Sequence, residues 1–137
     1  KYDLYGMNNN QPIWADNFIN KISQSKMGLN LSQGKAVKYY SSDRFAQLIG
    51  NGLLVFVDEK TRFKDFLNQN EIITYKNIND LATKIIKFNK NDKLRKKIAK
   101  KGREKYHKFF NSTKIAEYII NKTFNFKSEK YFWEKKL

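Results

Sequence analysis

Hydroxyl and cationic side chains that could bind an anion lie close together in one stretch of the chain. Lys35 and Lys38 precede Ser41 and Ser42, and Arg44 follows two residues later. Serine is a favoured N-cap residue because its hydroxyl accepts a hydrogen bond from a free N–H group of the first helical turn. A helix N-terminus also carries a partial positive charge that suits phosphate. The spacing therefore predicts an anion site at the start of a helix.

Arg44 is an unusual residue for the first turn of a helix. Cations favour the carboxyl end of a helix, so an arginine near its start is unfavourable unless a bound anion offsets its charge. The alternative is that Lys35, Lys38 and Arg44 are three solvated side chains on a basic protein. The sequence leaves both interpretations open.

A helix and a buried strand are predicted to position these residues. Phe45, Leu48 and Ile49 share one face at helical spacing, and residues 50–52, Gly-Asn-Gly, end the helix because they tolerate the left-handed conformation. Residues 53–57 form an unbroken apolar run, which is typical of a parallel strand covered on both faces.

Strands and helices alternate along most of the chain. The strands are predicted at residues 2–6, 27–31, 53–57 and 72–75. Helices separate them, and further helices complete the chain after residue 88. This order predicts an α/β fold, a Rossmann-like parallel sheet of about four strands flanked by helices, with C-terminal helices. Such sheets bind ligands beyond the carboxyl ends of their strands, and residues 32–42 supply the cations and hydroxyls there.

Apolar spacing predicts the inner faces of the later helices. Thr61 is expected to cap a short helix, and Asn77 or Asn79 the next one. Gly102 is expected to allow close approach of a neighbouring segment rather than to end its helix. The expected buried positions are Leu81, Ala82, Ile85 and Ile86 in one helix, Leu94, Ile98, Tyr106, Phe109 and Phe110 in the next, and Ile115, Ala116, Ile119 and Ile120 in the last.

The length of 137 residues fits one domain, and its net charge of +15 is unevenly spread. From Lys84 onward, 18 Lys and Arg oppose 5 Asp and Glu, whereas the first 83 residues hold 10 against 8. A basic half of this kind can bind nucleic acid or anionic lipid, but we favour helices with solvated outer faces. We assign residues 1–124 to the domain and residues 125–137 to a basic, aromatic tail.

Several kinds of chemistry lack the residues that they need. The chain has no cysteine, which excludes thiol catalysis and zinc–thiolate sites and fits a reducing cytosol. Neither a GxGxxG nor a GxxxxGK[ST] sequence occurs, so the common dinucleotide and NTPase sites are unsupported. The single histidine, His107, is expected at the surface. Asp58 and Glu59 follow a strand, where helix capping is a simpler role than acid–base catalysis.

Together, these features resemble the C-terminal part of group 1 glycosyltransferases, and most closely the spore-maturation-type branch. The similarity runs from about residue 5 to residue 120. Its most specific part is residues 38–58, where Ser42-Asp43-Arg44 opens the helix that ends at glycine before the apolar strand. Weaker similarities are Asn-Ile-Asn-Asp-Leu at residues 77–81 and Lys-Lys-Ile-Ala-Lys-Lys-Gly at residues 96–102.

The resemblance implies a GT-B enzyme, in which two Rossmann-like domains face each other and the C-terminal one binds the nucleotide sugar. Arg44, with Ser41, Ser42, Lys38 and Lys35, would then bind the diphosphate of a UDP- or GDP-linked donor. Such enzymes need no metal and no further cofactor, because cationic side chains and a helix N-terminus stabilise the leaving diphosphate.

The resemblance also implies contacts to the rest of the donor. The loop containing Gly6, Met7 and Asn8 would lie near the base and ribose. Family members usually have glutamate three residues after the arginine, as a ribose ligand, and Gln47 occupies that position here. Gln47 can accept a hydrogen bond from a hydroxyl but carries no charge.

We expect the chain to be a fragment of a cytoplasmic enzyme of cell-surface polysaccharide synthesis, peripheral at the inner face of the membrane. A further N-terminal domain would bind a glycan or lipid-linked acceptor and supply the catalytic base, so no catalytic residue is assigned here. The alternatives are a nucleic-acid-binding module that uses residues 84–137, which no recognition motif supports, and a non-catalytic scaffold on an anionic membrane surface.

Overall fold

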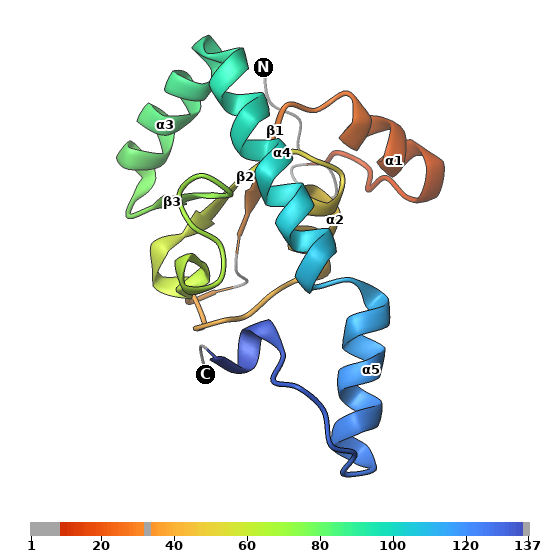
Figure 1. Cartoon of the computed structure of the whole chain (residues 1–137). Helices are drawn as coiled ribbons and strands as arrows, with labels where there is room; N and C mark the ends of the chain where they lie inside the picture. Colours follow the sequence, from red (N-terminus) through yellow and green to blue (C-terminus); the bar gives the residue numbers. More distant parts are fainter. Residues whose placement is uncertain (1–8, 32–33, 136–137) are drawn as a thin grey trace.

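A computed structural model describes residues 9–31 and 34–135 as an α/β structure (Figure 1). The strands are β1 (Met27–Asn30), β2 (Leu54–Asp58) and β3 (Ile73–Tyr75). The α-helices are α1 (Ala15–Ser23), α2 (Asp43–Gly50), α3 (Ile78–Lys90), α4 (Asp92–Phe109) and α5 (Ser112–Thr123). Short 3₁₀ helices are η1 (Glu59–Thr61), η2 (Phe63–Asp65) and η3 (Phe132–Lys135).

The strands form a parallel sheet in the order β1-β2-β3. The predicted fold class is therefore confirmed, and the strands predicted at residues 27–31, 53–57 and 72–75 are all present. The strand predicted at residues 2–6 lies outside the described residues. Because the central strand pairs on both sides, its backbone polar groups are satisfied within the sheet.

Strand β2 contributes side chains to two hydrophobic cores. Val55 and Val57 belong to the core that contains the α2 residues Phe45 and Ile49. The alternate side chains of β2, at positions 54 and 56, pack with residues of α3 and α4. Side chains at positions 54–57 are at most 1% exposed, as expected for a parallel strand covered on both faces.

The predicted Thr61 cap is wrong, because Arg62 is the N-cap residue of the short helix η2 and makes no side-chain cap bond. Asp58 caps the preceding turn η1, where its Oδ1 accepts a hydrogen bond from the Lys60 N–H at 2.8 Å. The chain turns immediately after β2, so the Asp58 carboxylate is the first acceptor to reach a free N–H group. Thr61 is buried at the end of η1, where its hydroxyl donates to the Asp58 carbonyl at 2.6 Å.

The predicted inner face of α3 is correct only at Leu81. Phe88 is the other buried residue of this helix, whereas Ala82, Ile85 and Ile86 are exposed. Lys84 lies between the two buried residues along the same stripe, and its ammonium donates to the Thr74 carbonyl at 2.8 Å. A lysine can therefore cover the sheet with its hydrocarbon chain while its ammonium group is hydrogen-bonded to a strand carbonyl. A prediction that counts only apolar residues overlooks such an inner position.

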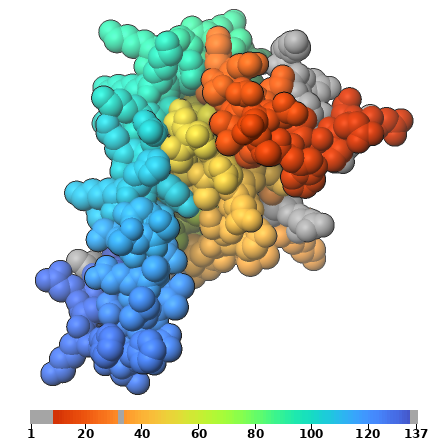
Figure 2. Space-filling view, turned by 90° about the vertical axis from the view of Figure 1, so that its right-hand side faces the viewer, coloured from red at the N-terminus to blue at the C-terminus, as the bar shows by residue number. Residues whose placement is uncertain are grey.

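The predicted burial of one face of α5 is wrong. No residue of α5 is buried, and Ile115, Ile119 and Ile120 are 38%, 56% and 49% exposed. The physical reason is the position of the helix, because α5 extends away from the sheet at the lower right of Figure 1 and protrudes in Figure 2. Its apolar periodicity is helical, but no sheet lies beneath that face.

Helix α4 follows its prediction more closely. Ile98 is buried, and Leu94, Tyr106 and Phe110 pack against the two cores. Gly102 is also buried, and a Cβ atom at this position would collide with the carbonyl oxygen of Glu71. The expected close approach at Gly102 is therefore confirmed.

The substitution Gly102→Ala should destabilise the protein. Alanine favours a helix by about 1 kcal/mol over glycine, but displacing a packed backbone carbonyl costs about 1–3 kcal/mol and should prevail. We expect a lower midpoint of urea unfolding, followed by circular dichroism. The matched control is Gly50→Ala in α2, where the nearest atom to the new Cβ is His107 Nε2 at 3.9 Å. Similar midpoints for the two variants would refute the close approach.

Candidate functional site

The N-terminus of α2 is fastened to the end of β1. Ser42 is the N-cap, and its Oγ accepts a hydrogen bond from the Phe45 N–H at 3.4 Å. The same hydroxyl donates to Asn30 Oδ1 at 2.9 Å. Asn30 is the last residue of β1 and is 3% exposed. This pair of bonds confirms the predicted cap and places the helix N-terminus at the carboxyl end of β1.

Arg44 lies at the same edge of the sheet. Its Nη1 donates to the carbonyl of Leu31, the residue after β1, at 3.2 Å, and the side chain is exposed. A guanidinium has five N–H donors, so this bond leaves donors available to a ligand. Arg44 is thus held beside the strand end, and it also has a structural role that the sequence did not reveal.

The remaining predicted anion-site residues are exposed. Lys35, Lys38 and Ser41 lie on the segment that leads into α2. The Lys38 ammonium lies 4.5 Å from the centroid of the Tyr39 ring. Asp43 shares the first turn of α2 with Arg44. Its negative charge interacts favourably with the partial positive charge of the helix N-terminus, whereas the charge of the arginine does not.

Of the residues expected to contact the ribose and base, Gln47 lies in the part of the chain that the structure describes. It is exposed and lies three residues after Arg44, so both side chains are on one face of α2. Gly6, Met7 and Asn8 lie outside the described residues.

Tyr39 is a residue that the sequence did not single out. Its φ of 61° is unusual for a residue with a side chain. Hydrogen bonds from its backbone and from the end of its side chain hold Tyr39 in this conformation. Its N–H donates to the Thr61 carbonyl at 2.9 Å, and its hydroxyl donates to Asp65 Oδ2 at 2.8 Å. Its ring meets Phe66 edge-on, with the centroids 4.9 Å apart. Tyr39 therefore ties the segment before α2 to η1 and η2.

The hydrogen bond between Tyr39 and Asp65 affects both groups. It raises the pKa of the Tyr39 phenol and lowers the pKa of the Asp65 carboxyl. Arg62 Nη2 lies 2.7 Å from the same carboxylate oxygen and also lowers the pKa of Asp65. The Asp65 carboxylate thus joins Tyr39 and Arg62.

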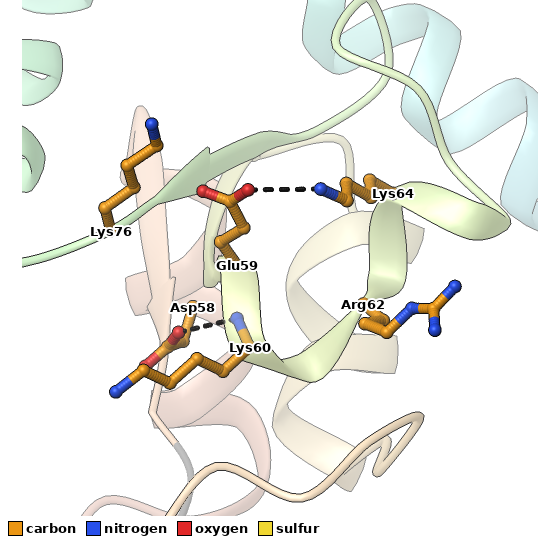
Figure 3. Close-up of a pocket in the computed structure, with 6 residues that line it drawn as sticks. All are labelled: Asp58, Glu59, Lys60, Arg62, Lys64 and Lys76. Atoms are coloured by element: carbon orange, nitrogen blue, oxygen red, sulfur yellow. Dashed lines mark hydrogen bonds and ion pairs between the residues drawn. The ribbon is translucent and has the colours of Figure 1, made fainter.

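An open pocket of about 470 Å³ lies beyond the carboxyl ends of β2 and β3 (Figure 3). Every residue that lines it is charged, and the set is Asp58, Glu59, Lys60, Arg62, Lys64 and Lys76. Glu59 Oε1 lies 3.1 Å from Lys64 Nζ, and this bond lowers the pKa of Glu59. Four cations against two acids give the pocket a net positive charge. The structural role expected for Asp58 is confirmed by its cap of η1.

Sequence reasoning missed this pocket and the role of Asn30. Asp58 ends β2 and the pocket residues 59–64 follow it, whereas Lys76 follows β3, so only the pairing of β2 with β3 brings them together. For Asn30 a signal existed, because a polar side chain at the end of a predicted strand marks the edge where ligands bind such sheets.

His107 and the acidic residues show no sign of a metal centre. His107 is exposed as predicted, and its Nε2 lies 2.9 Å from the Gly50 carbonyl oxygen. Within residues 9–31 and 34–135, no three histidine or acidic side chains come together in a way that could hold a metal ion.

Comparison with known proteins gives one finding. A family model described as glycosyl transferase-like matches residues 1–121. No curated protein and no solved structure matches the chain.

The two adjacent serines should differ sharply in their effect on stability. Ser42→Ala removes the cap, which costs about 1 kcal/mol, and leaves the buried Asn30 oxygen without this donor, at a cost of about 1–3 kcal/mol. We expect the free energy of unfolding in urea to fall by about 2–4 kcal/mol. Ser41→Ala is the control and should change it by less than about 0.5 kcal/mol. An equal loss in both variants would contradict the cap geometry.

Proposed function

This chain belongs to the glycosyl transferase-like family, and from that membership we propose that it is the nucleotide-sugar-binding portion of a glycosyltransferase. The donor would be a UDP- or GDP-linked sugar. We propose that the acceptor is a glycan or a lipid-linked glycan, bound by a second domain that also supplies the catalytic base. The GT-B arrangement and the spore-maturation-type branch are part of the same proposal.

One observation carries the donor site. Ser42 and Arg44 hold the start of α2 against Asn30 and Leu31, at the carboxyl end of β1. Parallel α/β sheets bind their ligands at this edge, and a helix N-terminus there offers N–H groups to phosphate. This geometry supports a diphosphate that contacts the first turn of α2, Arg44, Ser41 and Ser42, with Lys38 and Lys35 nearby.

The charge of the surrounding surface supports the same assignment. The charged pocket beyond β2 and β3 has an excess of cations, and Tyr39 connects η1 and η2 to the segment before α2. A positive potential along this edge would attract a donor with a charged diphosphate.

These residues would act on the leaving group. As the bond between the anomeric carbon and the diphosphate oxygen breaks, its electron pair stays with that oxygen, and negative charge grows on the diphosphate. Fixed cations and N–H groups aimed at this charge stabilise the transition state more than the ground state. In our proposal they do so without a metal or further cofactor. The acceptor oxygen bonds to the anomeric carbon, and its hydroxyl loses its proton to the base of the second domain.

The rest of the donor would extend from the diphosphate along α2. Gln47 follows Arg44 on the same face and would accept a hydrogen bond from a ribose hydroxyl. Gly6, Met7 and Asn8 would contact the base and ribose. We further propose a cytoplasmic enzyme of cell-surface polysaccharide synthesis, peripheral at the inner face of the membrane.

Arg44→Ala should weaken donor binding. Loss of a charge-assisted hydrogen bond costs about 1.5–3 kcal/mol, so we expect the Kd for a UDP- or GDP-sugar to rise about tenfold to hundredfold. Isothermal titration with both donors measures this change.

Arg103→Ala provides a matched control for Arg44→Ala. Arg103 is also exposed and also donates one 3.2 Å bond to a backbone carbonyl, that of Gly50 at the opposite end of α2. Arg103→Ala removes the same charge as Arg44→Ala and should leave the Kd for the donor unchanged. Equal Kd values for Arg44→Ala and the unmodified chain would exclude Arg44 from the site, and equal weakening by both variants would indicate a nonspecific charge effect.

Gln47→Glu should strengthen donor binding. A hydrogen bond to a charged acceptor is roughly twice as strong as one to a neutral acceptor, so we expect a Kd about fivefold lower. A donor in which hydrogen replaces both ribose hydroxyls is the control, and both proteins should bind it equally. If the glutamate variant gains nothing with the intact donor, the ribose contact of Gln47 is wrong.

A further inference from the structure

Residues 112–130, which we call the arm, protrude from the α/β core at the lower right of Figure 1 and stand clear of it in Figure 2. One side of the arm is braced by the segment that follows it. The Tyr118 ring packs edge-on against Tyr131 and Trp133, with centroids 5.2 Å and 5.5 Å apart. Lys122 pairs with Glu134 at 2.7 Å. The arm is therefore a built element with a defined orientation.

Three isoleucines of the arm face solvent. They are Ile115, Ile119 and Ile120, none of which is buried, and the surface beside Ile120 also contains Ser112, Thr113, Glu117 and Asn121. Aliphatic side chains that recur at helical spacing on a solvent-facing surface are typical of an interaction site.

Two phenylalanines form the tip of the arm. Phe124 and Phe126 stack with centroids 5.7 Å apart and are 64% and 60% exposed. Their backbone is fixed by the helix end, because the Phe126 N–H donates to the Asn121 carbonyl at 2.9 Å across Asn125, whose φ is 55°. In this type of helix end, a hydrophobic residue at the position of Phe126 usually packs back on the last turn. Here the ring stays in solvent beside Phe124.

Lysines outnumber acidic residues in the arm. Lys114, Lys127 and Lys130 are exposed, as are Glu117 and Glu129, and the whole chain carries a net charge of +15. Exposed apolar side chains on a segment with an excess of lysine complement a surface that combines anionic groups with a hydrocarbon interior.

We propose that the arm docks on an anionic phospholipid bilayer. Phe124 and Phe126 enter the boundary between headgroups and acyl chains, the isoleucine face lies along the interface, and the lysines contact anionic headgroups. The described helices are too short or too polar to cross a bilayer, so the arm lies in the interface. This inference rests on the peripheral membrane location proposed above and is independent of the donor site.

Two other occupants fit the arm less well. A second copy of the chain would bring the same positive charge against it. Single-stranded nucleic acid stacks on aromatic rings, but it offers nothing to the three isoleucines. A bilayer satisfies both the apolar and the cationic parts of the surface.

Co-sedimentation with vesicles tests the proposal. The chain should bind vesicles of phosphatidylcholine that contain about one-third phosphatidylglycerol and should bind pure phosphatidylcholine at least tenfold more weakly, since each lysine near an anionic surface contributes about fivefold. The double variant Phe124→Ser/Phe126→Ser should weaken anionic-vesicle binding at least tenfold. Its control, Ile78→Ser/Ile86→Ser, removes two exposed apolar side chains from α3 and should bind as the unmodified chain does.

A fluorophore locates the contact. Because the chain contains no cysteine, Ser128→Cys gives a single thiol near the tip, and Asn89→Cys gives one on α3. An environment-sensitive dye should shift to the blue on anionic vesicles at position 128 and stay unchanged at position 89.

Other outcomes would overturn the proposal. The bilayer proposal is wrong if the chain does not bind anionic vesicles, if Phe124→Ser/Phe126→Ser (the serine variant) binds them equally well, or if the dye shifts at position 89 alone. It is also wrong if the serine variant loses a dimer on size-exclusion chromatography. Loss of oligonucleotide affinity in that variant, with vesicle binding intact, would favour nucleic acid instead. Donor titration of the serine variant separates this test from the proposed function, because its Kd should match that of the unmodified chain.

Discussion

The central constraint on this structure is the burial of β2 from Leu54 to Val57. A strand with both edges paired and both faces covered needs a helix layer on each side, and α2 supplies one while α3 and α4 supply the other. Since its neighbours run parallel to it, the carboxyl ends of all three strands meet at one edge. The polar residues that follow each strand are therefore collected there, although they lie far apart in the sequence.

The parts of the fold that the sequence predicted are those whose signal is local. The apolar run at residues 53–57 has the length and composition of a buried parallel strand. Ser42 and the glycines at 50 and 52 mark the two ends of α2. The N-cap of α2 and the position of Arg44 beside the sheet edge followed from these signals. Neither needed knowledge of a distant residue.

The errors concern properties that depend on tertiary position. Apolar spacing shows which side of α5 is hydrophobic but not whether anything covers it. On α3, Lys84 occupies an inner position because its ammonium group donates a hydrogen bond to the carbonyl of Thr74 in β3. Tyr39 and the charged pocket were missed because their partners come from segments that only the folded sheet brings together.

Helix α2 is secured at both ends by different elements. At its start, Ser42 is bonded to Asn30 at the end of β1, and Arg44 is bonded to Leu31, the next residue. At its other end, Gly50 accepts a bond from Arg103 and lies within hydrogen-bond reach of His107, both on α4. A helix of about 12 Å that is held in this way cannot tilt independently of the sheet. At the proposed donor site, a diphosphate would therefore meet a preorganised helix N-terminus, and little entropy would be lost on ordering the receptor when the complex forms.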